Sequence, residues 1–257
     1  MRARLLVIMV GAGLVTTIAP AGEHSFDAWQ ERAEKALEKA LRKDPASPAI
    51  RRAYAEFLFA NGQLGAAVIQ WRWAQELEPD AATANALGGA YLQMGRAADS
   101  AAQFSRAIGL AGDNAAYHYN RANVQYMLRH ELAAAWKIEL PELLRRALAD
   151  FRAASRLAPN DIEYARSYAE TFYGVPDPNW AEAEAAWKHV LALSPQGDFA
   201  YLNLARVSLK RGDAAGARRS LEKVRDVRTE PLKRKLREQA DRLCRQRHSI
   251  SISIESR

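Results

Sequence analysis

Prolines that end apolar helical segments recur at intervals close to 34 residues, and this period constrains the fold more than any other feature of the chain. Pro45, Pro79, Pro159 and Pro195 each close such a segment, and turn-forming residues follow. Gly112 takes the equivalent place in the remaining unit. Units this short cannot bury an apolar face alone, so the period predicts stacked units that share a core.

A bulky residue stands between small residues at the spacing small-x3-bulky-x2-small-x4-proline, except that Val190 takes one of the small places and Gly112 takes one of the proline places. The bulky residues are Trp71, Phe104, Phe151 and Trp187. Upstream, a second small residue precedes a bulky one by three or four positions and marks the first helix of a pair. Two helices approach closely only where one side chain is small, so the spacing predicts helix pairs in which an aromatic ring fills a hole in the partner helix.

The segment Leu87-Gly88-Gly89-Ala90-Tyr91 and the aligned residues above resemble the tetratricopeptide repeat family, whose unit carries Trp-x2-Leu-Gly-x2-Tyr, then Ala-x3-Phe, then Pro. Ala84 stands where the family has Trp. The resemblance covers residues 26–228, as five helix pairs and a leading half-unit. It implies an all-α, right-handed superhelical solenoid of helix-turn-helix repeats whose concave face binds proteins.

The first 21 residues are predicted to be a signal peptide. Arg2 and Arg4 precede a largely apolar, uncharged run of fourteen residues, and Ala19-Pro20-Ala21 fits a cleavage site. Because a span of the bilayer needs about 20 apolar residues, an uncleaved membrane anchor is the less favoured alternative. We therefore expect an exported protein of a bacterial periplasm, with an inner-membrane anchor as the alternative.

The remaining chain is divided into a solenoid over 22–228, a basic capping helix over 229–247 and a flexible tail over 248–257. Residues 218–257 hold thirteen Lys or Arg and six Asp or Glu, in a chain of net charge +7. Such a basic face favours solubility first and contact with anionic lipid second, and we expect no nucleic-acid partner. Residues 249–254 alternate Ser and Ile at the period of a strand.

The third unit is about thirteen residues longer than the others, and the extra residues fall within Leu128 to Glu142. Pro141 fits the first turn of the second helix. Three bulky apolar residues precede or adjoin it: Trp136, Ile138 and Leu140. They either fold back onto a neighbouring pair or form a second partner-binding site.

The sequence shows no pattern typical of a catalytic or metal centre. No two of the five histidines have the i, i+4 spacing of ligands on one helix. His130-Glu131 begins a zinc-protease pattern, but Ala134 stands where the second histidine belongs. Cys244 is the single cysteine, so no intramolecular disulfide can form. We predict neither enzyme activity nor a metal or cofactor, and an enzyme site assembled in the groove is the less favoured alternative.

The resemblance implies that the first helix of each pair presents the partner-binding residues. Carried over unit by unit, these are Arg52, Glu56, Asn85, Gln93, Tyr119, Asn123, Tyr126, Arg166, Glu170, Tyr173, Arg206 and Lys210. Amide, Tyr and Arg side chains suit an extended peptide, because amides bond its backbone and aromatic rings take its side chains. We predict a scaffold for a protein partner in envelope or secretion-complex assembly, with a membrane-tethered accessory subunit of a multiprotein complex as the alternative.

Overall fold

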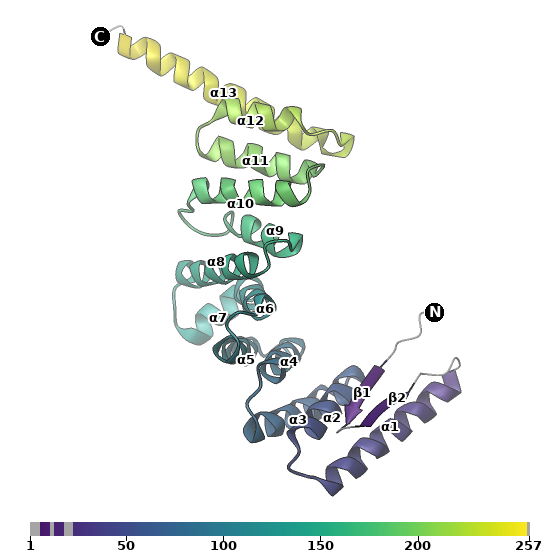
Figure 1. The fold of residues 1–257 in the computed structure, drawn as a ribbon. Coiled ribbons are helices and arrows are strands. Elements are labelled where there is room, and N and C mark those ends of the chain that lie inside the picture. The colour runs from purple at the N-terminus through teal and green to yellow at the C-terminus, as the bar shows by residue number, and fades with distance from the viewer. Residues whose placement is uncertain (1–5, 11–12, 18–22, 256–257) are drawn as a thin grey trace. The chain divides into compact units, whose positions relative to one another are not determined.

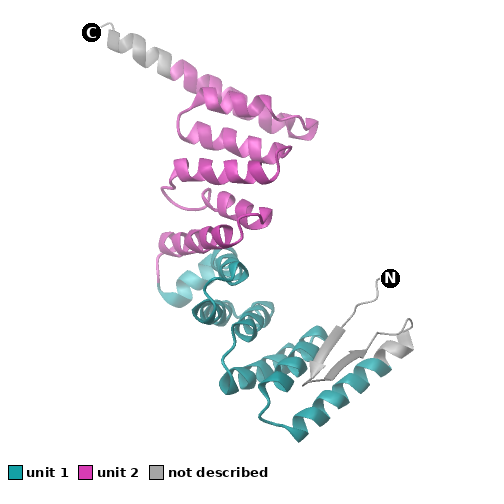
Figure 2. Ribbon diagram, viewed as in Figure 1, with its two compact units in different colours: residues 1–137 teal, residues 138–257 magenta. Residues whose placement is uncertain are grey.

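The computed structural model describes the backbone of residues 6–10, 13–17 and 23–255, and the side chains of residues 28–246. This part of the chain forms thirteen α-helices, one 3-10 helix and a short antiparallel hairpin (Figure 1). It divides into two compact units, residues 1–137 and residues 138–257 (Figure 2). Each unit is a stack of helices, which confirms the predicted all-α solenoid fold.

Unit 1 contains the hairpin and seven helices. Its elements are β1 (Leu6–Val10), β2 (Gly13–Thr17), α1 (Glu23–Lys43), α2 (Pro48–Ala60), α3 (Leu64–Leu77), α4 (Ala81–Gln93), α5 (Ala97–Leu110), α6 (Ala115–Met127) and α7 (Arg129–Trp136). α2 packs on α3 and α4 on α5, as consecutive pairs. Leu37 of α1 lies in the same buried cluster as Phe57 and Trp71, so α1 packs against the first pair.

Unit 2 contains six α-helices. Its elements are α8 (Leu140–Leu157), α9 (Ile162–Thr171), α10 (Trp180–Leu193), α11 (Asp198–Lys210), α12 (Ala214–Glu222), the 3-10 helix η1 (Val227–Thr229) and α13 (Glu230–Glu255). α9 pairs with α10 and α11 with α12, and α13 packs on both α11 and α12. The predicted consecutive pairing is thus confirmed within each unit, whereas the right-handed superhelix stays a prediction.

The predicted stop signals coincide with the helix ends. Pro45, Pro79, Pro159 and Pro195, and Gly112 in the fifth place, each lie two residues beyond the last residue of a helix. Helix starts are fixed by side chains that accept a backbone N–H of the first turn. These N-cap residues are Ser47, Asp80, Asn114, Asp161, Asn179 and Asp213.

Three glycines reverse the chain between the helices of a pair. Gly62, Gly95 and Gly212 have φ of 75°, 71° and 74°, in the left-handed region that a Cβ disfavours. The residue after Gly95, Arg96, donates its backbone N–H to the Tyr91 carbonyl at 2.8 Å. This bond across the left-handed residue is the Schellman arrangement, which satisfies a carbonyl that the helix end would otherwise leave unpaired.

The large residues of the second helices are buried as predicted. Trp71, Phe104 and Phe151 are each 3% exposed, and Trp187 is fully buried. Phe104 lies directly against Gly88 of the preceding helix. The Ser100 hydroxyl, also buried, donates to the Gly88 carbonyl at 2.8 Å, so the same contact satisfies a buried polar group.

The insert of the third unit forms the short helix α7. Leu132 of α7 is fully buried and α7 contacts α5 and α6, so the insert folds back onto its own unit. Lys137 ends α7 in the left-handed conformation, with φ of 53°. Trp136, Ile138 and Leu140 are half-buried. They neither form a closed core nor project freely, and the second binding site remains a prediction.

The two ends of the chain were predicted to be a signal peptide and a flexible tail. The predicted signal peptide over 1–21 includes β1 and β2, but its cleavage site at 19–21 lies outside the described residues. Signal and cleavage therefore stay predictions. At the other end α13 continues to Glu255, where the sequence predicted a capping helix over 229–247 and a flexible tail over 248–257. A helix that is already nucleated adds one backbone hydrogen bond per residue, whereas a strand here has no partner in the sequence.

Candidate functional site

Eleven of the twelve predicted binding residues lie on the first helices of the pairs, and Tyr173 lies just after α9. By helix they are Arg52 and Glu56 on α2, Asn85 and Gln93 on α4, Tyr119, Asn123 and Tyr126 on α6, Arg166 and Glu170 on α9, and Arg206 and Lys210 on α11. The first seven belong to unit 1, and the other four belong to unit 2 together with Tyr173.

In unit 1 the predicted residues pair locally with neighbours. Arg52 forms an ion pair with Glu78 at 3.3 Å, not with Glu56 of its own helix. Burial raises the pKa of the Glu56 carboxyl, and Arg52 opposes that rise. The Asn120 amide donates to the Asn85 carbonyl oxygen at 2.8 Å and so links α6 to α4. These contacts hold helix faces in register but do not gather into one cluster.

The residues of α6 are half-buried. Tyr119, Asn123 and Tyr126 each expose an intermediate fraction of their surface. The Arg129 guanidinium lies 5.7 Å from the centre of the Tyr126 ring and donates to the Tyr126 carbonyl at 3.0 Å. Tyr126 is therefore held from the α7 side while part of its surface stays accessible.

In unit 2 three cations lie over three aromatic rings, and we call these six residues the cation–aromatic cluster. Its members are Arg166, Tyr173, Trp180, Phe199, Arg206 and Lys210. The Arg206 guanidinium is 4.2 Å from the Tyr173 ring centre, Lys210 Nζ is 5.8 Å from the Trp180 ring, and the Arg166 guanidinium is 5.8 Å from the Phe199 ring. Cation–aromatic contacts at exposed sites stabilise by about 0.5–1 kcal/mol each. All three cations are exposed, so the rings orient them without burying them.

The rings of this cluster are anchored in the core through Trp187. Tyr173 lies 5.8 Å from Trp180 and 6.5 Å from Trp187 between ring centres, and Trp187 lies edge-on to Phe199 at 5.5 Å. The Tyr173 hydroxyl donates to the Asn203 carbonyl at 3.2 Å. Burial raises the pKa of Tyr173 to about 12, against the opposing charge of Arg206. Phe199 nevertheless remains 51% exposed, so the cluster offers a fixed aromatic surface to a ligand.

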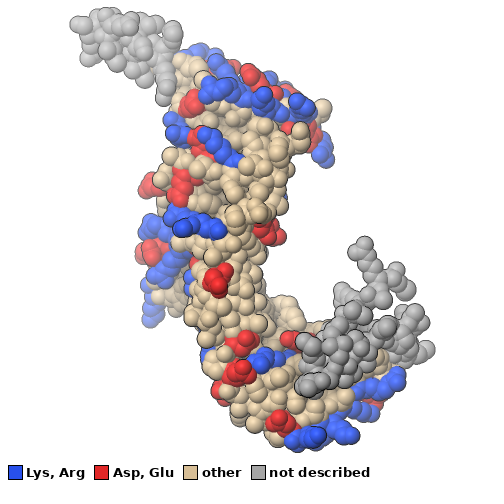
Figure 3. Space-filling view, viewed as in Figure 1, with Lys and Arg blue, Asp and Glu red and all other residues tan. Residues whose placement is uncertain are grey.

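A groove of about 720 Å³ lies between α11 and α13, and we call it the α11–α13 groove. It is lined by Arg206, Leu209, Lys210, Leu232, Lys235, Leu236, Gln239, Arg242, Leu243 and Gln246. These ten described residues comprise four cations, four leucines and two amides, with no Asp or Glu among them. Figure 3 shows Lys and Arg side chains gathered over α12 and α13 on the face in view.

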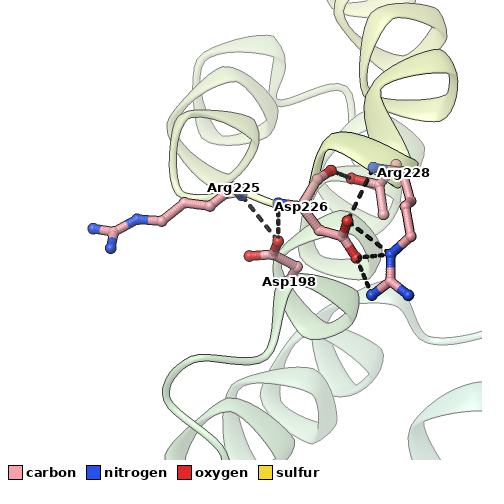
Figure 4. Close-up of polar contacts among 5 residues, drawn as sticks. Asp198, Arg225, Asp226 and Arg228 are labelled. Carbon is pink, nitrogen blue, oxygen red and sulfur yellow. Dashed lines mark hydrogen bonds and ion pairs between the residues drawn. The ribbon is translucent and has the colours of Figure 1, made fainter.

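The position of α13, and hence the groove, depends on a hydrogen-bonded loop (Figure 4). The Asp198 carboxylate, at the start of α11, accepts the backbone N–H groups of Arg225 (3.0 Å) and Asp226. Asp226 in turn accepts the backbone N–H of Arg228 at 2.9 Å and pairs with its guanidinium at 2.8 Å. The Arg228 contacts lower the pKa of the Asp226 carboxyl. The loop is thereby fixed to α11 before α13 begins.

Hydrophobic packing completes the attachment of α13. Leu236 and Ala240 are buried in one cluster with Leu202 of α11 and Leu221 of α12. Leu232, one turn before Leu236, is 42% exposed. Leu232 lines the α11–α13 groove instead of joining this cluster.

Sequence reasoning missed Trp180 and Phe199 of the cluster and, apart from Arg206 and Lys210, the lining of the groove. Trp180 opens α10 and Phe199 is the second residue of α11, positions that the repeat pattern leaves unassigned. The signal for the groove was present in the spacing of Leu232, Leu236 and Leu243, because the intervening turns carry Lys235 and Arg242 on the same side.

Among residues 28–246, no three His, Cys, Asp or Glu side chains lie together in a way that could hold a metal ion. Within the same described part, none of the helices combines the length and the apolar character that crossing a membrane requires.

Comparison with known proteins places the fold. A family model described as tetratricopeptide repeat matches residues 31–69, from α1 into α3. The sequence matches no curated protein.

Several solved structures have a similar fold. YrrB, described as a TPR protein with an unusual peptide-binding site, shares 19% identity over 80% of this chain and 99% of its own, with a TM-score of 0.63. The C-terminal part of a TPR repeat-containing protein from Cytophaga hutchinsonii shares 16% identity over 77% of this chain and 74% of its own, with a TM-score of 0.57. MamA shares 15% identity over 73% of this chain and 94% of its own, with a TM-score of 0.55. At these identities the likeness shows the fold alone, which is that of tetratricopeptide repeat proteins.

Proposed function

We propose that this chain is an exported scaffold that binds a polypeptide on the faces of its first helices, with the cation–aromatic cluster of unit 2 as the main anchor. The observation that carries the proposal is the contact of Arg206 with the Tyr173 ring, which packs in turn on the buried Trp187. Binding energy at protein interfaces concentrates in Tyr, Trp and Arg side chains that are held in place before the partner arrives.

The chemistry of the cluster suits an extended chain. Arg166 and Arg206 are exposed; Arg166 pairs with Glu170 at 3.1 Å and Arg206 donates to the Asn203 side-chain oxygen at 3.1 Å. A guanidinium has five N–H donors, so each can also bond peptide carbonyls. Phe199 gives an apolar contact for a side chain at little cost in conformational entropy. The description of YrrB as having a peptide-binding site supports the same use of this fold.

Export rests on the predicted signal peptide. The test is the mass of the mature protein isolated from the cell envelope: a chain that begins at Gly22 supports a cleaved, periplasmic protein. A chain that retains residues 1–21 supports the membrane-tethered alternative instead.

The binding proposal is tested with a partner isolated from envelope extract on the immobilised protein. Calorimetry with that partner should show Arg206→Ala and Phe199→Ala weakening binding by about 1–2 kcal/mol each. Arg234→Ala, an exposed arginine of α13 outside the cluster, is the matched control and should bind as the wild type does. Full affinity of both cluster variants would contradict the proposal.

A further inference from the structure

We propose that the α11–α13 groove takes an acidic polypeptide segment that also carries apolar side chains, so that the partner is an acidic one. This inference rests on the proposed function and names the chemistry of its ligand. It follows from the charge of the groove, its leucines and its continuity with the cation–aromatic cluster.

The charge of the groove comes from both of its walls. Arg206 and Lys210 belong to α11, and Lys235 and Arg242 belong to α13. Asp241, next to Arg242 in sequence, pairs instead with Arg218 of α12 at 2.5 Å and so does not offset these cations within the groove. Four like charges around one hollow repel each other, and an anionic ligand relieves that repulsion.

Leucines make up the apolar part of the lining. Leu209, Leu232, Leu236 and Leu243 lie among the cations, and Leu232 is 42% exposed. A bare anion would leave these leucines in water. A ligand that removes their apolar surface from water gains about 25 cal/mol per Å² of area covered, so it needs apolar groups as well as negative charge.

Continuity with the cluster favours a polypeptide over a lipid surface. Arg206 and Lys210 line the groove and also stack on Tyr173 and Trp180. A chain that lies on the cluster therefore runs into the groove without a break. A flat membrane surface would instead meet exposed cations of α13 outside the groove, such as Arg234 and Arg237.

The test is selection of peptides from a random displayed library on the immobilised full chain. We expect the enriched peptides to combine Asp or Glu with Leu, Ile or Phe. One enriched peptide, labelled with a fluorophore, is then titrated by anisotropy against three proteins. These are the wild type, the double variant Lys235→Glu/Arg242→Glu in the groove, and the control Arg234→Glu/Arg237→Glu on the outside of the same helix.

Both double variants change the net charge equally, so they separate the groove from the general field of the protein. We expect the groove variant to weaken binding at least about tenfold and the control to change it less than about threefold, because a reversed charge against an acidic ligand repels it. Circular dichroism checks that both variants keep the wild-type helix content. A Lys235→Gln/Arg242→Gln variant removes charge without reversing it. Its affinity for the peptide should lie between those of the wild type and the Lys235→Glu/Arg242→Glu variant.

Each other outcome overturns a specific step. Enriched peptides without acidic residues, or equal weakening by the two double variants, overturn the acidic-segment inference and leave the proposed function standing. If no peptide is enriched at all, both the acidic-segment inference and the proposed function fail. The last measurement uses vesicles of phosphatidylserine in phosphatidylcholine. If the protein binds these vesicles but no peptide, and both double variants weaken vesicle binding equally, the basic surface is a membrane-binding surface.

Discussion

Gly88 and Phe104 show how a single atom decides the packing of a helix pair. A Cβ added at Gly88 would lie 2.6, 2.7 and 2.9 Å from three ring carbons of Phe104, which is itself buried. At the adjacent Gly89 nothing lies within 4 Å of an added Cβ. Both glycines are inside α4, so they differ in packing and not in backbone conformation.

We expect Gly88→Ala to lower the free energy of unfolding by about 1–3 kcal/mol, because the Phe104 ring or the helix backbone must shift. Gly89→Ala should raise it by about 0.5–1 kcal/mol, because alanine favours a helix interior. Urea unfolding of both variants measures the difference. Effects of the same sign at the two positions would show that packing at Gly88 does not control the pair.

The buried residues could be predicted from the sequence, but the cation–aromatic pairs could not. Burial of Trp71 and Trp187 follows from a repeating spacing, because the period fixes which side of a helix meets its partner. Contact of Arg206 with Tyr173 depends on where one helix places a long side chain relative to the next helix. Sequence predicted the face that carries both residues, and geometry decides which ring each cation meets.

Two tyrosines of unit 2 give a pH dependence of stability. The pKa of Tyr168 is raised to about 12 by burial and by its hydrogen bond to Glu182, with Arg152 opposing, and that of Tyr173 is raised to about 12 by burial. Both values lie above the ordinary 10.0, so the unfolded chain loses these protons first. Their contribution is fully present below about pH 10 and is lost as the pH rises through about 12.

We therefore expect the free energy of unfolding to decrease from pH 10 to pH 12, and the drop to be smaller in Tyr173→Phe and in Tyr168→Phe. Tyrosinate absorbance of the folded protein should show two groups that titrate near 12. If all tyrosines of the folded protein titrate near 10, the burial of these two hydroxyls is not as described.

At the scale of elements, α13 is positioned by the loop that precedes it. Asp198 accepts two backbone N–H groups of this loop, and it also lies in the first turn of α11, where a negative charge is favoured by the helix dipole. A carboxylate in this place joins the last helix pair to the helix that caps it.

We expect Asp198→Ala to lower the free energy of unfolding by about 1–2 kcal/mol, since hydrogen bonds to a charged acceptor are lost. Amide hydrogen exchange at Arg225 and Asp226 should become faster. Asp241→Ala removes another carboxylate, one in a half-exposed ion pair with Arg218, and should cost less than about 1 kcal/mol. A loss at Asp198 no larger than this control would contradict the anchoring role of the loop.

Helix boundaries were largely predictable because proline and glycine act locally. A proline cannot continue a helix, and each predicted stop lies two residues past a helix end. The insert and α13 were less predictable, because their extents depend on tertiary contacts. Burial of Leu132 holds the insert against its own unit. The groove that Leu232 lines forms only when α13 packs on α11 and α12.

At the scale of the whole molecule, the predicted anchors fall in both units. Asn123 and Tyr126 lie on α6 of unit 1, and Arg166 lies on α9 of unit 2. All three are among the binding residues that the resemblance implied, and we call them the central anchors because they lie in the middle repeats of the sequence. Arg166 also belongs to the cation–aromatic cluster, whereas Asn123 and Tyr126 lie outside it.

A partner that occupies first helices of both units should respond to changes in each. Tyr126→Ala should then weaken binding by about 1–2 kcal/mol, and its effect should add to that of Arg206→Ala, because the two residues belong to separate compact units. Calorimetry of the single variants and of their combination measures this additivity. If Tyr126→Ala and the triple variant Asn123→Ala/Tyr126→Ala/Arg166→Ala both keep full affinity, the central anchors are wrong. In that case Trp136→Ala decides between two alternatives. If Trp136→Ala weakens binding, the partner contacts unit 1 at the insert; if Trp136→Ala binds as the wild type does, the partner binds unit 2 alone.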